Sequence, residues 1–370
     1  MQALLDAIAA MSLPTDARRI FHGRGGLHPG CEQWVLDAYP PVFVLTSFAP
    51  ATEDELAAVG AALQARWAQI APPGEPLNWV FQSRQGPGSE TRLMAGSVPD
   101  PHVVTENGAR FRVHVLRGQN HGLFLDMAAG RDWVRRQVLA HERPARMKVL
   151  NLFAYTCAFS VVALQAGARQ VVNVDMGHGA IAIGQQNHQL NGIATGASFL
   201  AHDIFSSWGK ITRGGPYGLV IVDPPSYQKG SFVATKDYAR LMRRLPDLLA
   251  PDGQVLLCLN APELGTAFLR EQMSEIAPEL HFTQRIPNPP VFADVDEERS
   301  LKVLVYRAPG LPGASSEATV ASAAQVVVVS VVAAAAAAVV PLEVLAVEVA
   351  VVALAVAVVV EDGSANRDDI

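Results

Sequence analysis

The sequence predicts an α/β protein built on a mainly parallel sheet, with a smaller α+β region before it. From about Lys148, short runs rich in Val, Leu and Ile alternate with helical patterns, which is typical of βαβ units. Several of these runs end in a polar residue, so the predicted sheet has one polar edge. The last two runs are separated by a proline-rich segment that is too short for a crossover helix, so they should pair antiparallel.

Residues before about Arg110 have a different pattern. The segments VFVLTSF and NWVFQSR are strand-like, EDELAAVGAALQARWAQI is an amphipathic helix, and pieces rich in Gly and Pro separate them. We therefore expect a small N-terminal α+β domain over residues 1–110. A linking hairpin and helix are expected over residues 111–147.

The main domain is expected over residues 148–308. Helices are predicted at 178–190, 237–249 and 266–276, and Pro246 should distort the second of them near its end. Ser160 is expected to cap the helix after the first strand. The predicted strands are KVLNLF, QVVNVD, SFLAHD, GLVIVD, QVLLCLN, HFTQRI and KVLVYRA.

Residues 309–370 have a low-complexity composition, since Gln325 to Val360 is almost wholly Val and Ala. We expect this tail to stand outside the fold, as a disordered or aggregation-prone appendage or as the product of an altered reading frame. A membrane span stays open as an alternative. It is disfavoured because acidic residues interrupt the run and no Lys or Arg flanks it.

Charge and cysteine content restrict the class of protein. Seven acidic residues and one arginine lie beyond Arg307, so the tail carries the whole formal charge of −6 and the body is about neutral. A neutral body gives no support to strong nonspecific nucleic-acid binding. The three cysteines have no metal-ligand spacing, and His22 and His28 have no convincing third ligand, so no metal is expected. The same cysteine pattern disfavours a disulfide framework, so a reducing cytoplasm fits best. The N-terminal MQALLDAIAAM is expected to be an amphipathic helix rather than a signal peptide, and no membrane association is expected.

Two carboxylates at strand ends point to a nucleoside. Asp175 follows the second strand, where it can accept hydrogen bonds from both hydroxyls of a ribose. Asp203 follows the third strand and is placed to meet an adenine amino group. A helix N-cap is the structural alternative for Asp175. The first turn lacks GxGxxG, which disfavours a dinucleotide pyrophosphate site.

The segment LNLFAYTCAFSVVALQAGARQVVNVDMG, followed by NHQLNG and VIVDPPSY, resembles the class I S-adenosylmethionine-dependent methyltransferases that modify bases of large-subunit ribosomal RNA. The upstream NHGLFLDMAAGR is similar to a further segment of that group, and together these motifs cover about Gln119 to Ala308. The resemblance implies a Rossmann-like sheet of seven strands, parallel but for one, and S-adenosyl-L-methionine as cofactor. It implies cofactor-binding roles for Phe124, Asp126, Arg131, Asn151, Phe153, Tyr155, Thr156, Asp175, Met176 and Asp203.

Cys157 departs from this family pattern, because the family usually has Gly at that position. Its side chain could crowd the approach of the backbone to the cofactor. A small buried Cys is tolerable if this residue keeps a negative φ.

The segment DPPSY should hold the catalytic groups. Asp223 and the carbonyl of Pro224 can accept hydrogen bonds from a base, Pro225 helps to stiffen the turn, and Tyr227 can stack on the base. A purely structural Pro-Pro turn is the alternative. Asn260 follows the fifth strand, where it can help position the substrate.

The acceptor atom is expected to be nitrogen. Methylation at carbon five of a pyrimidine needs a thiolate nucleophile, and Asn260 stands where the cytosine-methylating relatives have that cysteine. Cys258 is two residues earlier and inside a strand, so we expect it in the core.

The sequence thus predicts a cytoplasmic methyltransferase that acts on a base nitrogen of ribosomal RNA. Methylation of a protein or small molecule stays open, as does a noncatalytic RNA-binding or partner-binding protein on the same scaffold, for which Cys157 is the cue. Two sets of arginines could hold phosphates near the site entrance, although solvated helix faces are the commoner explanation. They are Arg240, Arg243 and Arg244, and Arg131, Arg135 and Arg136.

Overall fold

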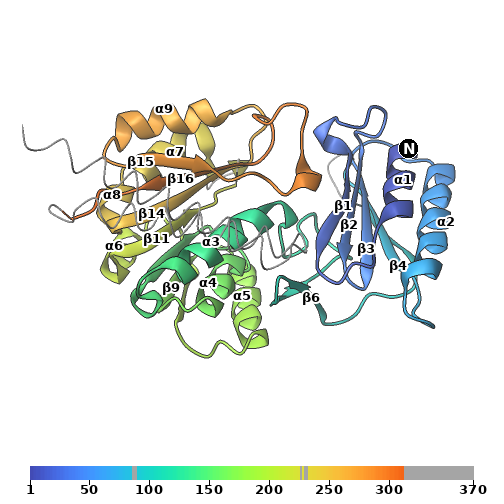
Figure 1. Cartoon of the computed structure of the whole chain (residues 1–370), viewed down its shortest axis with the longest axis horizontal. Coiled ribbons are helices and arrows are strands. Elements are labelled where there is room, and N and C mark those ends of the chain that lie inside the picture. The colour runs from blue at the N-terminus through green and yellow to red at the C-terminus, as the bar shows by residue number, and fades with distance from the viewer. Residues whose placement is uncertain (86–89, 226, 229–231, 312–370) are drawn as a thin grey trace, which may run out of the picture. The chain divides into compact units, whose positions relative to one another are not determined.

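The computed structural model describes residues 1–85, 90–225, 227–228 and 232–311 of the 370-residue chain. By their contacts, Met1–Pro309 form one unit, and this unit contains two separate main sheets. Figure 1 shows both sheets with the helices that cover them. The Val- and Ala-rich tail, which we expected outside the fold, lies outside the described residues. No helix of the described part is both long and apolar enough to cross a bilayer.

The first sheet has five strands in chain order, and it is mainly antiparallel. Its exception is the parallel pair β3–β4, which needs a crossover that α2 supplies. The first turn of α2 is fixed by a reciprocal capping box between Thr52 and Glu55. Helices α1 and α2 bury one face of this sheet, and apolar residues of the opposite face pack with the β6–β7 hairpin. The bounds are α1 Gln2–Ala10, β1 Arg18–His22, β2 Trp34–Tyr39, β3 Val42–Ser47, α2 Glu53–Ile70, β4 Asn78–Ser83 and β5 Glu90–Ala95.

A hairpin and a helix connect the two sheets along the chain. The hairpin pairs β6, His102–Glu106, with β7, Ala109–Val113. After it, the short 3₁₀ helix η2, Leu125–Met127, leads directly into α3, Ala128–Ala140. The hairpin therefore begins several residues before the expected linking segment.

The second sheet has seven strands in the order β10-β9-β8-β11-β14-β16-β15. Its neighbouring strands are parallel except at β16, which runs antiparallel to both β14 and β15. The predicted antiparallel pairing of the last two strands is thus confirmed. The strand order reverses between β8 and β11, which is where ligands bind in such sheets. The bounds are β8 Lys148–Leu152, β9 Gln170–Val174, β10 Ala197–Leu200, β11 Tyr217–Val222, β14 Leu249–Leu259, β15 His281–Arg285 and β16 Lys302–Arg307.

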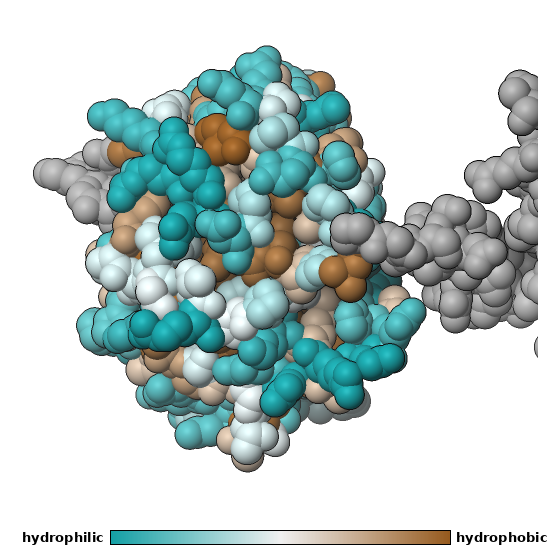
Figure 2. Space-filling view, turned by 90° about the vertical axis from the view of Figure 1, so that its left-hand side faces the viewer, coloured by the Kyte–Doolittle hydropathy of each residue, from teal (hydrophilic) through white to brown (hydrophobic). Residues whose placement is uncertain are grey.

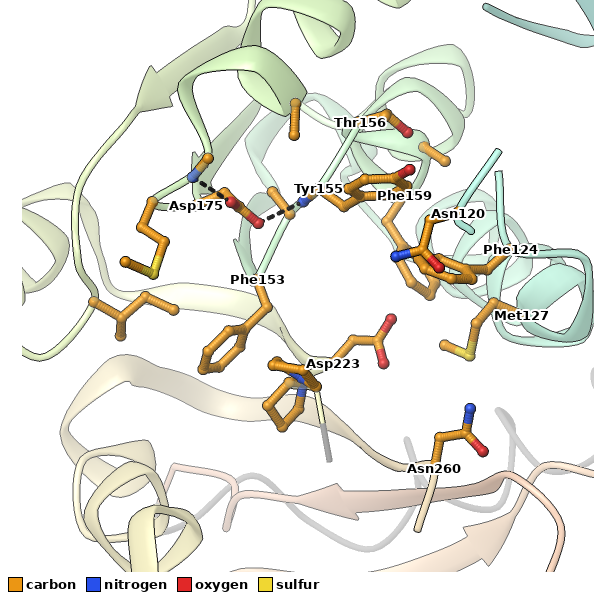
Figure 3. A pocket seen from close by; sticks show the side chains of 18 of the residues that line it. Asn120, Phe124, Met127, Phe153, Tyr155, Thr156, Phe159, Asp175, Asp223 and Asn260 are labelled. Carbon is orange, nitrogen blue, oxygen red and sulfur yellow. Dashed lines mark hydrogen bonds between the residues drawn. The ribbon is translucent and has the colours of Figure 1, made fainter. Parts of the chain in front are cut away.

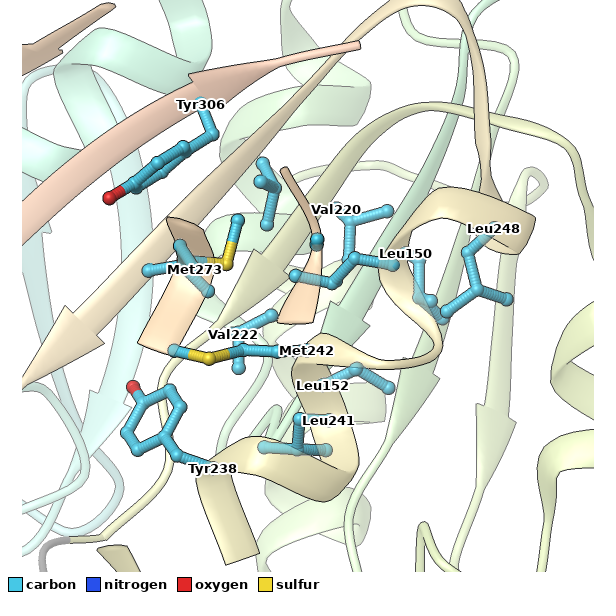
Figure 4. Close-up of a cluster of buried hydrophobic side chains, with 14 of the residues drawn as sticks. Leu150, Leu152, Val220, Val222, Tyr238, Leu241, Met242, Leu248, Met273 and Tyr306 are labelled. Atoms are coloured by element: carbon cyan, nitrogen blue, oxygen red, sulfur yellow. The ribbon is translucent and has the colours of Figure 1, made fainter. Parts of the chain in front are cut away.

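Helices cover both faces of this sheet, and its inner strands β8, β9 and β11 are buried on both sides. In β8, Val149 packs toward α3 and α4, whereas Leu150 and Leu152 pack on the opposite face toward α7 and α8. Figure 4 shows this second cluster, in which Tyr238 and Met273 join the strand residues. Burying each such side chain contributes about 1.5–3 kcal/mol. The bounds are α4 Ala158–Gln165, α5 His178–Leu190, α6 Trp208–Gly214, α7 Ala234–Met242, α8 Leu245–Leu248 and α9 Thr266–Ile276.

The predicted α/β class with a central helix-covered sheet is confirmed, with corrections to local detail. Ser160 does not cap α4, because the N-cap is Cys157 and Ser160 is buried inside the helix. The helix expected over 237–249 is divided into α7 and α8, with Pro246 in the first turn of α8, where its missing N–H is tolerated.

Figure 2 shows the end of the molecule that lies on the left in Figure 1, where hydrophilic side chains cover most of the surface and hydrophobic ones show between them.

Candidate active site

A cavity of about 570 Å³ lies at the carboxyl ends of the parallel strands, close to the reversal of strand order. Its volume falls in the range of about 300–1,000 Å³ that is usual for small-ligand sites. The wall combines four aspartates, Asp126, Asp175, Asp203 and Asp223, with aromatic and aliphatic side chains. Figure 3 shows Asp175 and Asp223 on this wall. Most of it comes from the segments that follow β8, β9, β10, β11 and β14, and the segment before α3 closes one side.

The loop between β8 and α4 has an unusual backbone. Phe153, Tyr155 and Cys157 have φ values of +58°, +49° and +62°, although none of them is glycine. Each such residue costs about 1–2 kcal/mol relative to the right-handed conformation. Contacts from other segments offset this cost: the Tyr155 amide donates to the Asp175 carboxylate at 2.8 Å, and the Thr156 hydroxyl donates to the Gly122 carbonyl at 2.6 Å. The loop shape is therefore fixed by its neighbours.

Cys157 does not keep the negative φ on which its tolerance was expected to depend. Its thiol nevertheless causes no crowding of the cavity, because Cys157 is fully buried and is not among the residues of the cavity wall. The side chain lies against Gly184 of α5, where an added Cβ would stand only 2.5 Å from the sulfur. Burial raises the pKa of this thiol far above its ordinary value, so the group stays neutral. Gly184 thus provides the space that Cys157 occupies.

Asp175 joins the ends of two strands at the cavity wall. One carboxylate oxygen accepts from the Tyr155 amide at 2.8 Å, and the other accepts from the Gly177 amide at 2.7 Å (Figure 3). A carboxylate oxygen has a second lone pair, so both can still accept from hydroxyl groups. Asp175 is not the N-cap of α5, because that position belongs to Gly177, which has no capping side chain.

Asp203 lies on another part of the wall, beyond the end of β10. Its carboxylate accepts from the Ser206 amide at 2.9 Å, which holds it in place while the side chain stays exposed. Phe205 follows it at the wall and provides an aromatic surface. This part of the cavity can take a planar group with a hydrogen-bond donor at its edge.

The pKa of Asp223 is strongly raised in this site. Burial raises the pKa of its carboxyl to about 7, the negative charge of Asp126 adds to the rise, and Arg131 opposes it. Burial also raises the pKa of Asp126 itself, against the influence of Arg19 and Arg131. Near neutral pH, Asp223 is therefore divided between its protonated and ionised forms. A positively charged ligand nearby would favour the ionised form.

Arg131 is less available to a ligand than its position suggests. Its guanidinium donates to both oxygens of Glu106 at 2.6 and 2.8 Å, and to the Phe124 carbonyl at 2.7 Å. Burial alone would lower the pKa of Arg131, but the paired Glu106 carboxylate outweighs it and the pKa is raised. Arg131 thus fixes the segment around Phe124 over the cavity.

No cysteine reaches the cavity, and all three lie in the described part of the chain. Cys31, Cys157 and Cys258 are buried, and none of them belongs to the cavity wall. Burial raises the pKa of Cys258 well above its ordinary value, as expected for a core thiol in β14. A covalent mechanism through a thiolate therefore has no candidate here.

Most residues that the sequence singled out meet at this one cavity, whose wall includes Phe124, Asp126, Arg131, Phe153, Tyr155, Thr156, Asp175, Met176, Asp203, Asp223, Pro224, Pro225 and Asn260. Asn151 does not reach it. Its amide is buried in β8 and donates to Asn173 at 2.9 Å, because its side chain lies on the same face of the strand as Val149, toward α3 and α4. The backbone of Tyr227 forms the short strand β12, Tyr227–Gln228, and its side chain lies outside the described residues.

Several residues of the cavity wall were not predicted from the sequence. Asn120 and Met127 lie within the segment around NHGLFLDMAAGR, so that segment held a signal for them. Phe205 had none, because nothing local distinguishes it from a core residue. The two sets of arginines that were expected to hold phosphates are partly neutralised by ion pairs. Arg240 pairs with Asp237 at 2.9 Å, and Arg136 pairs with Asp132 at 3.0 Å.

Comparisons with known proteins agree with this geometry. A family model described as S-adenosylmethionine-dependent methyltransferase matches residues 18–307. The ribosomal RNA large subunit methyltransferase I of Aeromonas salmonicida is 30% identical over 183 residues, which are 48% of this chain and 45% of the relative. The enzyme of that name from Klebsiella pneumoniae strain 342 is 28% identical over 264 residues, covering 70% of this chain and 63% of the relative. The chain thus spans about half the length of the first such relatives.

A second relative by name, the ribosomal RNA large subunit methyltransferase K/L of Psychrobacter sp., is 33% identical over 46% of this chain and 21% of its own length. Among solved structures, the methyltransferase SMU.776 complexed with SAH has a TM-score of 0.67 at 22% identity, with 83% of this chain and 81% of that chain covered. The SAM-dependent methyltransferase of Agrobacterium tumefaciens has a TM-score of 0.57 at 19% identity, covering 81% and 92%. At these identities the structures show a shared fold.

Proposed function

The chain belongs to the S-adenosylmethionine-dependent methyltransferase family, and we propose that it methylates a base nitrogen of ribosomal RNA. The observation that carries this proposal is one cavity at the strand ends, with Asp175 and Asp223 on separate parts of its wall. The names of the curated relatives favour ribosomal RNA as the substrate class.

The residues of the cavity fit the cofactor of this family. Asp175 keeps lone pairs for two ribose hydroxyls, and Asp203 with Met176 and Phe205 can enclose an adenine. The loop residues Phe153, Tyr155 and Thr156 would surround the amino-acid part, and Phe124, Asp126 and Arg131 would cover it. When bound, S-adenosyl-L-methionine supplies a methyl group already activated on a sulfonium centre.

Asp223 would orient the acceptor. In its ionised form the carboxylate accepts a hydrogen bond from the amino or ring N–H of the base, which aligns the lone pair of that nitrogen. The Pro224 carbonyl is a second acceptor, and the two prolines limit the movement of both groups. Asn260, also at the cavity wall, would hold another edge of the base. Stacking by Tyr227 stays part of the proposal.

Nitrogen is favoured over carbon because all three thiols are buried away from the cavity. The alternative of a noncatalytic scaffold rested on the expectation that the Cys157 side chain crowds the cofactor. That expectation loses its physical basis, because this side chain lies against Gly184. Methylation of a protein or small molecule is the rival that the neutral body still permits.

The proposal includes the finer organisation of the chain. In this proposal the chain has an N-terminal α+β domain over residues 1–110 and a linking hairpin and helix over 111–147. A class I methyltransferase domain with a Rossmann-like seven-stranded sheet follows over 148–308. The two separate sheets support this division, and the course of β7 across residue 110 favours a boundary before His102. Residues 309–370 are proposed to stand outside the fold, and the protein to act in the cytoplasm.

The test uses full-length protein, labelled S-adenosyl-L-methionine and ribosomal RNA from a strain that lacks the gene. Label should enter one nucleoside. Asp223→Ala should lower the rate by about 100-fold or more, the range for loss of a positioned catalytic group. Asp132→Ala, which removes a carboxylate paired with Arg136 away from the cavity, is the matched control.

Each alternative predicts a different failure. Cofactor binding without label in RNA would move the substrate to a protein or small molecule, and an absence of cofactor binding would favour the noncatalytic scaffold. Equal rates for Asp223→Ala and Asp132→Ala would refute the role of Asp223.

A further inference from the structure

Two arginines of the N-terminal sheet region share one aromatic ring, and no carboxylate of the described residues forms an ion pair with either. The Arg24 guanidinium lies 3.8 Å from the centroid of Phe48, and that of Arg84 lies 5.6 Å from it. Neither takes part in an ion pair among the described residues. Arg19 on β1 is different, since it is paired with Asp37 at 2.8 Å. The cluster of Arg24, Arg84 and Phe48 is called the Phe48 cluster below.

The Phe48 cluster has an excess of positive charge. Burial lowers the pKa of Arg24, and the neighbouring charge of Arg19 lowers it further. Burial likewise lowers the pKa of Arg84. The positive charges of Arg19 and Arg24 lower this pKa further, whereas the negative charge of Asp37 raises it. Arg19, the positively charged neighbour of both arginines, is itself paired with Asp37, and neither Arg24 nor Arg84 forms an ion pair among the described residues. A bound anion would relieve this repulsion, because it restores the missing negative charge.

The cluster is connected to the cavity through one short loop. The Arg84 guanidinium donates to the Gln119 carbonyl, and the Gln82 amide donates to the Gly118 carbonyl at 2.5 Å. The next residue along the chain, Asn120, belongs to the cavity wall. A chain molecule with one unit in the cavity could therefore extend over the Phe48 cluster.

We propose that Arg24, Arg84 and Phe48 bind the phosphates and an unpaired base of single-stranded RNA next to the nucleotide in the cavity. This inference rests on the proposed function and names the region of the protein that holds the substrate. A guanidinium held over an aromatic ring has fewer conformations to lose, and its outer N–H groups suit the oxygens of a phosphate diester. A base can stack on the same guanidinium and ring planes, as in other single-strand sites.

RNA is favoured over an acidic protein by the pairing of charge with an aromatic ring beside the cavity. A base bound in the cavity brings flanking phosphates and bases with it, which match both features of the cluster. An acidic peptide would need only the charge, so it serves as the competing outcome of the test.

The experiment measures binding of a fluorescent oligouridylate of about twenty nucleotides, longer than one binding site, to the full chain. Arg24→Gln and Arg84→Gln should each weaken binding about 3- to 10-fold. The double variant should lower the slope of log affinity against log salt by about 1.4, which corresponds to two lost phosphate contacts on a single strand. Phe48→Leu should weaken binding with little change of slope, because it removes stacking and leaves the charges.

Arg92→Gln is the matched control, because Arg92 also lies over a ring, that of Phe81 at 5.5 Å, but is paired with Glu53. Affinity for S-adenosyl-L-methionine should be the same in all variants, which shows that they are folded. Equal losses for Arg92→Gln and Arg84→Gln would overturn the proposal. So would polyglutamate binding that the same variants abolish while oligouridylate binding is unchanged, which would assign the cluster to an acidic protein.

The two proposals fail separately. If no RNA accepts label, oligouridylate binding still tests the Phe48 cluster. If RNA accepts label and the double variant leaves its KM unchanged, the proposed function stands and the cluster is not its RNA site.

Discussion

The loop after β8 and the turn after β11 leave adjacent strands and face the same cavity, but they are held in opposite ways. The β8 loop has three non-glycine residues with positive φ, and groups from other segments keep it in shape. The β11 turn follows Val222 with Asp223 and two prolines, whose rings restrict the backbone directly.

The conformation of the β8 loop thus depends on tertiary contacts, whereas that of the β11 turn depends on its own residues. The β8 loop should fail when a distant partner is changed, because its conformation is unfavourable by itself. The β11 turn should keep its shape after such changes. Its chemistry should instead respond to nearby charges, because the pKa of Asp223 depends on burial and on Asp126.

The largest effect is expected from Asp175→Ala. The variant leaves the Tyr155 and Gly177 amides without an acceptor and removes the proposed ribose contact. Each lost hydrogen bond to a charged group costs about 1.5–3 kcal/mol, so the Kd for S-adenosyl-L-methionine should rise about 100-fold or more by calorimetry. Asp223→Ala should change this Kd only slightly, and equal Kd values for wild type and Asp175→Ala would contradict the dependence of the loop on Asp175.

A smaller effect is expected from Gly184→Ala. The added methyl group would meet the Cys157 sulfur at 2.5 Å, so unfolding in denaturant should show a loss of about 1–3 kcal/mol. Cys157→Gly should restore much of this loss in the double variant, because it vacates the space and removes the left-handed cost of a side chain.

Gly179→Ala provides the control in the same helix, because a Cβ there meets nothing within 4 Å. It should be neutral or stabilising by up to about 1 kcal/mol, as the helix propensity of alanine predicts. Additive effects of Gly184→Ala and Cys157→Gly would show that the two positions are not coupled.

The smallest effect is a shift in pH dependence. Because the folded-state pKa of Asp223 is raised to about 7, its contribution to stability is present below the ordinary carboxyl pKa and is lost as pH rises through about 7. Activity should change in the opposite sense, since the ionised carboxylate is the proposed acceptor: kcat/KM should rise through the same range. Asp126→Asn removes a neighbouring negative charge, so the inflection should move to lower pH.

Asp203→Asn tests whether this shift is specific. Asp203 is at the cavity wall but is not among the groups that influence the pKa of Asp223, so its variant should keep the wild-type inflection. The interpretation fails if both variants have the same inflection as the wild type.

Much of the cavity wall could be predicted from the sequence because strand ends are local features. Asp175, Asp203, Asp223 and Asn260 each follow an apolar run, and parallel strands bring their carboxyl ends to one edge. Asn151 was the exception among these polar residues. It lies one position before the end of β8, and alternation along the strand turns its side chain away from the cavity.

Partners from distant segments could not be predicted. Ser160 looks like a helix cap in the sequence, yet it is buried and lies 2.8 Å from the ring of His188. Cys157 looks like a defect in its motif until Gly184 is placed beside it. Likewise, Arg24 and Arg84 are 60 positions apart and meet only at the Phe48 ring.

The sequence by itself determined the order along the chain of the seven strands of the second sheet, the α/β class and the polar edge of that sheet, because hydrophobic period and strand ends depend on neighbouring residues. The tertiary structure decided the left-handed loop, the raised pKa of Asp223 and the charge of the Phe48 cluster. These depend on side chains that approach from other segments, and only packing in three dimensions brings them together.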